Sequence, residues 1–260
     1  MSEVTHTVAR LAEKFSVPED RAFRHRERRF RVLGVTCTEC GQGIEEPKWS
    51  AEWHGYACDS CHEAFVERRR QAHAWEREKR ILMIDTPEGQ REQGIDREFW
   101  GASFADFPKM EKVMRGFCAG DPILLTLSGQ CGRGKTRLLH AIQRWAYVAG
   151  RPCRYHVVDE ITNRQFTEAN ELVESLIELN GCLLLDELGA GDPQEFALRR
   201  VERLVDARKR AGRSTAIGTN LGIEEISDAV SHRIASRMGD GHDARFIVLD
   251  GPDYRLGREG

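Results

Sequence analysis

The chain has 260 residues, of which 31% are charged and 40% are apolar, yet its formal net charge is only −3. This length allows one large domain or two modest ones, and the near-neutral balance excludes a polycation, so nucleic acid would have to bind at local basic patches. The apolar runs are too short to span a bilayer and residues 1–6 lack the apolar core of a signal peptide, so we expect a cytoplasmic protein with no membrane partner.

The N-terminal region, residues 1–80, is predicted to combine a basic helix with a small zinc-binding module. Residues 1–35 are expected to be helical and basic, with a dense run of arginines (Arg24, Arg26, Arg28, Arg29 and Arg31). Residues 63–80 are predicted to be one charged helix that carries a second basic run. Acidic residues interrupt both runs, so a DNA backbone contact, a solvated helix face and a protein contact all remain open.

Four of the eight cysteines form two Cys-x-x-Cys pairs, Cys37 with Cys40 and Cys58 with Cys61, and 17 residues (41–57) separate the pairs. This spacing is typical of a structural zinc site, in which four thiolates complete a tetrahedral Zn2+ shell. The segment buries too little surface to fold alone, so the metal would supply the missing stability.

Two alternatives compete with the four-cysteine site. His54 or His62 could replace one cysteine as a ligand. Residues 58–62 also match the attachment pattern of a c-type haem, but haem attachment would need export and would leave the first cysteine pair unexplained. The other four cysteines are expected to be small buried hydrophobes or free thiols (Cys118, Cys131, Cys153 and Cys182).

Residues 81–110 are predicted to be a linker, with a turn at residues 86–89 and with Phe104 and Phe107 as anchors. From residue 111 to residue 260, strand-like and helix-like runs alternate. The predicted strands are 123–127, 154–158, 182–186, 214–218 and 245–249. This alternation predicts an α/β domain with a parallel five-stranded sheet sandwiched by helices.

A phosphate-binding pattern, GxxxxGK[ST], lies between the first of these strands and the helix that follows it. It comprises Gly129, Gln130, Cys131, Gly132, Arg133, Gly134, Lys135 and Thr136. The glycines allow successive backbone N–H groups to turn toward one anion, and the helix N-terminus adds partial positive charge. Lys135 can reach the terminal phosphates of ATP and Thr136 can hold Mg2+. A chance glycine-rich turn is the alternative, and the flanking strand and helix argue against it.

Polar side chains also follow two other predicted strands. Asp186 and Glu187 follow an apolar run, and Asn220 follows residues 214–218. Asp186 is suited to position Mg2+ through bound water, and Glu187 is suited to orient or deprotonate the attacking water. Asn220 could hydrogen-bond the γ-phosphate and that water. An ordinary surface acid pair and a turn-forming asparagine are the alternatives.

Residues 231–238 place two arginines, Arg233 and Arg237, four positions apart on one helix face. An arginine presented to the nucleotide of a neighbouring subunit would stabilise transition-state charge and would make hydrolysis depend on assembly. Arg237 is the predicted finger and Arg233 is the reserve choice. A solvated helix face is the alternative.

The phosphate loop and three later motifs together resemble the AAA+ ATPases, and more narrowly the DnaC-type helicase loaders and the IstB-type transposition ATPases (Asp186-Glu187, Thr219-Asn220 and Ser236-Arg237). The resemblance covers residues 100–260 and implies an ATPase that assembles as a ring or spiral on DNA. Only 23 residues follow Arg237 (260 − 237), so a C-terminal helical lid is not expected there. Some loaders have a similar zinc module, which grips the helicase.

These features favour a helicase loader that binds ATP and single-stranded DNA and delivers a replicative helicase held by the N-terminal module. A transposition ATPase that binds target DNA and a transposase is the first alternative. The second is an adaptor that uses nucleotide as a switch without turnover, although Asp186, Glu187 and Asn220 argue against it. A nucleotide kinase would need a lid that the sequence does not offer.

Overall fold

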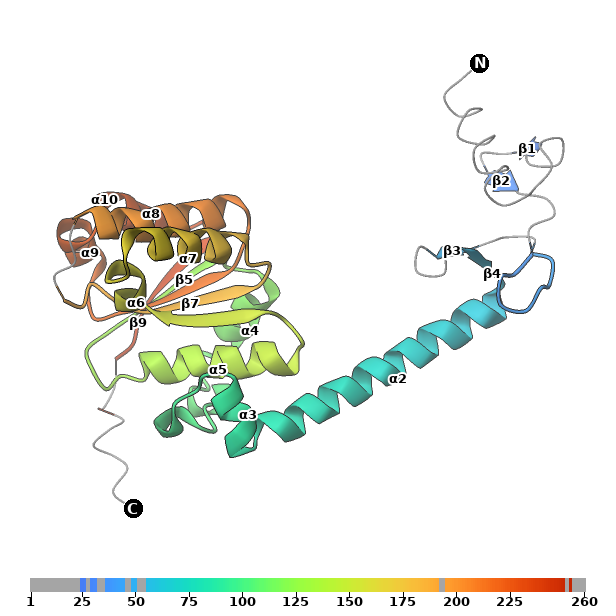
Figure 1. The fold of residues 1–260 in the computed structure, drawn as a ribbon, viewed down its shortest axis with the longest axis horizontal. Helices are drawn as coiled ribbons and strands as arrows, with labels where there is room; N and C mark the ends of the chain where they lie inside the picture. Colours follow the sequence, from blue (N-terminus) through green and yellow to red (C-terminus); the bar gives the residue numbers. More distant parts are fainter. Residues whose placement is uncertain are drawn as a thin grey trace. The chain divides into compact units, whose positions relative to one another are not determined.

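The computed structural model divides the chain into two compact units, Met1–Glu76 and Arg77–Gly260 (Figure 1). The boundary falls four residues before the predicted one at residue 80. The structure describes residues 24–26, 29–31, 36–44, 48–50, 55–191, 195–250 and 253.

The described part of the first unit contains two short antiparallel strand pairs. They are β1 (Arg24–Arg26) with β2 (Arg29–Arg31), and β3 (Lys48–Ser50) with β4 (Gly55–Ala57). The helix predicted for the arginine run is therefore wrong at the residues described there. Arg26 pairs with Arg29 across two residues, the commonest length of a hairpin connection, and this pairing overrides the helical pattern. The rest of residues 1–35, including Arg28, lies outside the described residues.

Helix α2 runs from Asp59 to Ile84, which confirms the charged helix predicted for residues 63–80. Its 26 residues are mostly exposed, including the large apolar side chains of Trp75 and Leu82. No helix in the described part of the chain combines the length and the apolar character that crossing a membrane requires.

The second unit is built on a parallel sheet with the strand order β6-β7-β8-β5-β9. Each strand begins and ends within two residues of a predicted strand, so the predicted α/β sheet is confirmed. The strands are β5 (Leu124–Ser128), β6 (Cys153–Val157), β7 (Cys182–Leu188), β8 (Thr215–Thr219) and β9 (Ala244–Val248). Strands β5 and β8 are buried at every residue because helices cover both faces of the sheet.

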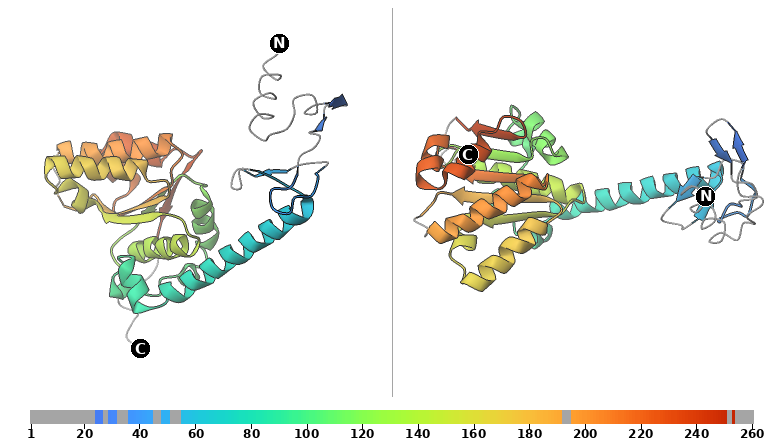
Figure 2. Two further views of the ribbon diagram at one scale, coloured as in Figure 1. Left: turned by 45° about the vertical axis from the view of Figure 1, so that its right-hand side comes forward. Right: turned by 90° about the horizontal axis from the view of Figure 1, so that it is seen from above.

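Helices cover both faces of this sheet, as Figures 1 and 2 show, and an apolar core lies on each face. The helices are α4 (Glu111–Ala119), α5 (Lys135–Val148), α6 (Val158–Thr162), α7 (Phe166–Glu178), α8 (Glu195–Arg210), α9 (Ile223–Ala229) and α10 (His232–Met238). Successive residues of β7 point into different cores. Leu184 packs in the core with α4 and α5, whereas Leu183 and Leu185 pack in the core with α7, α8 and α10.

Residues 81–110 are not a linker but a packed part of the second unit. They contain the end of α2 and three short helices, α3 (Pro87–Glu92), η2 (Arg97–Phe99) and η3 (Phe104–Asp106). The predicted turn is the start of α3, where the Thr86 hydroxyl accepts a hydrogen bond from the Gly89 N–H. Phe104 and Phe107 are buried anchors, as predicted. The polar composition suggested a linker, but a few buried apolar residues are enough to fix this segment to the core.

Candidate nucleotide site and metal centre

The phosphate loop connects the end of β5 to the start of α5, which is the strand–loop–helix setting that its pattern requires. Its three glycines all have positive φ angles, 151° at Gly129, 79° at Gly132 and 87° at Gly134. Residues with a Cβ rarely adopt these conformations, so glycine is what allows the chain to turn here. A Cβ on Gly132 would also clash with the carboxylate of Asp253, which packs against the loop.

The Lys135 ammonium lies inside this loop. Its Nζ donates hydrogen bonds to the carbonyl oxygens of Gly129 at 2.6 Å and Gln130 at 2.9 Å. The side chain is buried, so water screens its charge only weakly. The loop thus holds a cation where the pattern places the β- and γ-phosphates.

Asp186, at the end of β7, is buried and meets the first turn of α5. Its Oδ2 accepts hydrogen bonds from the Thr136 hydroxyl at 2.7 Å and the Tyr155 hydroxyl at 3.1 Å. Its Oδ1 accepts the Glu187 N–H at 2.9 Å. A hydroxyl and a carboxylate are the hard oxygen donors that Mg2+ prefers, so the residues present fit this ion.

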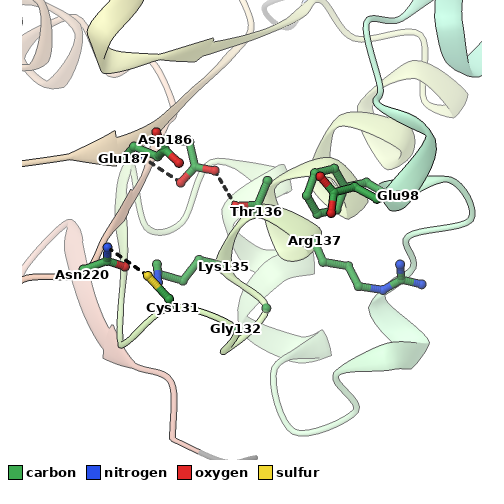
Figure 3. A pocket seen from close by; sticks show the side chains of 11 residues that line it. Glu98, Cys131, Gly132, Lys135, Thr136, Arg137, Asp186, Glu187 and Asn220 are labelled. Atoms are coloured by element: carbon green, nitrogen blue, oxygen red, sulfur yellow. Dashed lines mark hydrogen bonds between the residues drawn. The ribbon is translucent and has the colours of Figure 1, made fainter. Parts of the chain in front are cut away.

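Glu187 and Asn220 are exposed at the mouth of the same pocket. Strands β7 and β8 are parallel neighbours, so the residues at their carboxyl ends meet at one edge of the sheet. Asn220 Nδ2 donates to Cys131 Sγ at 3.6 Å, which places the amide against the phosphate loop (Figure 3). Glu187 has a positive φ of 61°, where the register of β7 against β8 is irregular.

One pocket therefore brings together the residues predicted from three separate motifs. Its lining is Glu98, Phe99, Cys131, Gly132, Gly134, Lys135, Thr136, Arg137, Asp186, Glu187 and Asn220. Figure 3 shows Lys135 between the phosphate loop and the two acids. This convergence, rather than any single motif, makes the pocket a candidate site for a triphosphate and a divalent cation.

The sequence did not point to a buried aromatic stack beside this pocket. The His140 ring packs between Phe99 and Tyr155, with ring centroids 4.8 and 4.5 Å away. Burial lowers the pKa of His140 and raises the pKa of Tyr155, which favours the neutral form of both rings. His140 Nδ1 and Gln143 Oε1 are 2.9 Å apart, and Gln143 donates to the Gln93 carbonyl. Residues far apart in sequence form this stack, so no linear pattern announces it.

Arg237 is not among the residues that line the pocket. Helix α10 carries it just before β9 begins, whereas the pocket lies at the carboxyl ends of the strands. Its guanidinium contacts Asp206 Oδ1 at 2.9 Å, and Asp206 also pairs with Arg210 at 2.9 Å and Arg233 at 3.3 Å. Asp206 is buried, while the Arg237 side chain is 39% exposed. Arg237 is thus at the surface, away from its own subunit's pocket.

The four paired cysteines form a second site, in the first unit. The sulfur atoms of Cys37, Cys40, Cys58 and Cys61 all lie within 4.8 Å of one another. Cys40 Sγ and Cys58 Sγ are 3.8 Å apart. Tetrahedral zinc with bonds of about 2.3 Å requires sulfur–sulfur edges of about 3.8 Å, so the arrangement fits the ion. His62 is not part of this cluster among the described residues, and His54 lies outside them.

Hydrogen bonds join the two cysteine pairs. The Thr38 N–H and hydroxyl both donate to the Tyr56 carbonyl, at 2.9 and 3.0 Å. Backbone hydrogen bonds from Cys58 and Cys40 lower the pKa of Cys37 to about 6, whereas the neighbouring Cys58 thiol raises the pKa of Cys61 to about 12. Four crowded thiols cannot all ionise without a cation, so these opposite shifts are expected for a cluster of metal ligands.

The comparisons with known proteins agree with this geometry. No protein-family model matches the chain. The replicative helicase loader DnaC of Escherichia coli strain K12 is 24% identical over 135 residues, which cover 49% of this chain and 54% of the relative. The chain therefore spans about half the length of the curated relatives that it matches.

Two solved structures extend the likeness to the fold. A crystal structure of DnaI matches with a TM-score of 0.53 and 22% identity, over 62% of this chain and 94% of DnaI. The replication initiator DnaA bound to AMPPCP and single-stranded DNA matches with a TM-score of 0.52 and 16% identity, over 62% of this chain and 53% of DnaA. The part of the chain built on the five-stranded sheet has the AAA+ fold found in these proteins, and the chain is a weak homologue of the helicase loader DnaC.

Proposed function

We propose that this chain is an ATP-dependent helicase loader of DNA replication, which binds ATP and single-stranded DNA and delivers a replicative helicase. The observation that carries the proposal is the convergence of the phosphate loop, Asp186, Glu187 and Asn220 on one pocket. We assign this proposed ATPase site to helicase loading because the chain is weakly homologous to a protein named as a replicative helicase loader.

Five polar residues of the pocket have distinct tasks in the proposed hydrolysis. Lys135 would hold the β- and γ-phosphates, and the Thr136 hydroxyl and Asp186 would hold Mg2+, which would neutralise phosphate charge. Glu187, exposed at the pocket mouth, orients the attacking water and takes its proton. The Asn220 amide hydrogen-bonds the γ-phosphate and fixes the direction of attack.

The surface position of Arg237 supports a role across a subunit interface. An arginine that does not line its own pocket is available to contact the nucleotide of a neighbour in a ring or spiral. If Arg237 turned toward a neighbour, Asp206 would lose that ion pair but would keep its pairs with Arg210 and Arg233. Hydrolysis would then depend on assembly of the oligomer.

The cysteine cluster supports a separate partner-binding module. Four thiolates would leave Zn2+ no open position, so the ion would be structural rather than catalytic. We therefore assign binding of the helicase, rather than chemistry, to this module. Single-stranded DNA binding draws support from the structure of DnaA bound to AMPPCP and single-stranded DNA, whose fold this chain shares.

A Glu187→Gln substitution tests the ATPase. Glutamine keeps the size and polarity of the side chain but cannot take a proton, so turnover should fall about 100-fold or more while ATP binding is unchanged. Steady-state phosphate release, with and without single-stranded DNA, measures the first, and binding of a fluorescent ATP analogue measures the second. Equal turnover in the two proteins would favour a nucleotide-switched adaptor.

Partner choice is tested by capture on the immobilised full chain. The replicative helicase of the same cell should bind, and the wild type with ATP should increase helicase activity on closed circular single-stranded DNA. Capture of a transposase in place of the helicase would favour a transposition ATPase.

Removal of the metal should release the helicase but not the nucleotide, because the two sites lie in different units. The full chain carrying Cys58→Ser and Cys61→Ser should lose its zinc and its helicase capture, and should keep wild-type affinity for ATP. Chelator treatment of the wild type should do the same, and added zinc should restore capture. Loss of ATP affinity together with capture would contradict the independence of the two units.

A further inference from the structure

We propose that Tyr155 is a positioning residue that holds the Asp186 carboxylate in place for the magnesium ion, an inference that rests on the proposed nucleotide site. No linear motif marks this tyrosine, and it does not line the pocket. Its hydroxyl instead donates a hydrogen bond to Asp186 Oδ2 at 3.1 Å. The same oxygen accepts a hydrogen bond from the Thr136 hydroxyl.

The register of the sheet brings the two residues together. Strand β6 lies at the edge of the sheet and pairs with β7, with Tyr155 opposite Leu184 and Val157 opposite Asp186. Alternate residues of a strand share a face, so Tyr155 and Asp186 are diagonal neighbours on the face that α5 covers. The tyrosine therefore contacts the carboxylate without lining the pocket itself.

Two further contacts, besides the Tyr155 hydroxyl, restrict the rotation of the Asp186 carboxylate. The Glu187 N–H holds Oδ1 at 2.9 Å. Gly218 of strand β8 packs tightly against the same carboxylate, because a Cβ on Gly218 would lie only 2.2 Å from Oδ1. The Tyr155 hydroxyl is thus the second of two side-chain donors to Oδ2, and without it Thr136 alone would hold that oxygen.

The Tyr155 ring is itself fixed. It packs against the fully buried His140 ring, which packs in turn against Phe99. Gln143 holds His140 through its amide oxygen and donates to the Gln93 carbonyl at 2.6 Å. A hydroxyl on a ring held this firmly can fix the direction of the carboxylate, which a mobile side chain could not. Phe99 also lines the pocket, so the stack ends at the nucleotide site.

Tyr155→Phe removes the hydroxyl and keeps the ring and its contact with His140. The experiment measures the affinity of the full chain for a fluorescent ATP analogue across a series of Mg2+ concentrations and in excess EDTA. Affinity in EDTA should equal that of the wild type, and the Mg2+ concentration needed for half-maximal enhancement should rise about tenfold. Higher Mg2+ should restore both binding and turnover. Tyr147→Phe, which removes the hydroxyl of a half-buried tyrosine on α5, should match the wild type throughout.

Three results separate the possible failures. The same Mg2+ dependence in Tyr155→Phe and the wild type would overturn the role of Tyr155. Equal weakening with Mg2+ and in EDTA would also overturn it, because it would show a general structural effect on the pocket. A wild-type chain with no Mg2+-dependent nucleotide affinity would instead refute the proposed site.

Discussion

Replacement of Lys135 by alanine should abolish nucleotide binding at ordinary ATP concentrations. The ammonium is buried and bonded to the carbonyl oxygens of Gly129 and Gln130, so its removal leaves those oxygens facing the phosphates with no cation between them. In the proposed complex the ammonium pairs with the phosphate charge, and loss of one partner from such a buried pair weakens binding by about 100-fold or more. Equilibrium titration with a fluorescent ATP analogue measures the change. Lys112→Ala, on the exposed face of α4, is the matched control and should bind normally.

The same variant also tests the predicted arginine finger. A Lys135→Ala subunit binds no ATP but still presents Arg237, whereas an Arg237→Ala subunit binds ATP but lacks the finger. If Arg237 acts on a neighbour, an equal mixture should hydrolyse ATP faster than the sum of the two variants measured alone. Activity equal to that sum, or normal activity in Arg237→Ala alone, would show that the finger is assigned wrongly.

Replacement of Arg208 by methionine should cause the largest loss of stability. This arginine of α8 is fully buried and donates to five oxygen atoms, those of the Thr215 hydroxyl and of the carbonyls of Leu176, Leu179, Gly181 and Ser214. Burial lowers its pKa to about 10, so it still carries its charge at neutral pH. Methionine fills much of the space but leaves buried carbonyl groups without donors, which should cost about 3–5 kcal/mol.

Urea unfolding followed by tryptophan fluorescence measures this loss. Arg203→Met is the matched control, because Arg203 lies on the same helix and forms an exposed ion pair with Glu174. Exposed pairs contribute about 1 kcal/mol or less, so this control should unfold close to the wild type. A similar midpoint for both variants would show that the Arg208 hydrogen bonds do not hold α7, α8 and β8 together.

The sequence predicted the sheet well because buried parallel strands are short, continuous apolar runs between helical patterns. Each of the five strands was therefore placed within two residues. The candidate site was predictable for a related reason: parallel strands end at one edge, so Asp186 and Asn220 had to meet near the loop that follows β5. The close approach of the four cysteine sulfurs also confirms a cluster that spacing predicted, while the zinc itself stays a prediction.

The errors arose where tertiary contacts decide the structure. Residues 81–110 are polar enough to suggest a linker, yet buried residues such as Ile84 and Ile95 fix them to the second unit. Tyr155 and Arg208 act through partners distant in sequence, so neither belongs to a motif. The first arginine run pairs as strands because hairpin formation outweighs helix propensity. The proposed role of Arg237 depends on a second subunit, so it follows from neither the sequence nor the fold of one chain.

The positive φ angle of Glu187 is unfavourable for folding, but the proposed chemistry needs the carboxylate at this position. A residue with a Cβ pays about 1–2 kcal/mol for a left-handed conformation that glycine adopts freely. The turn that requires this conformation also carries the carboxylate out of the buried strand and into the pocket mouth. A glycine here would relax the turn but would remove the carboxylate that the proposed hydrolysis requires, so the residue that best suits the backbone would be the one that cannot support that reaction.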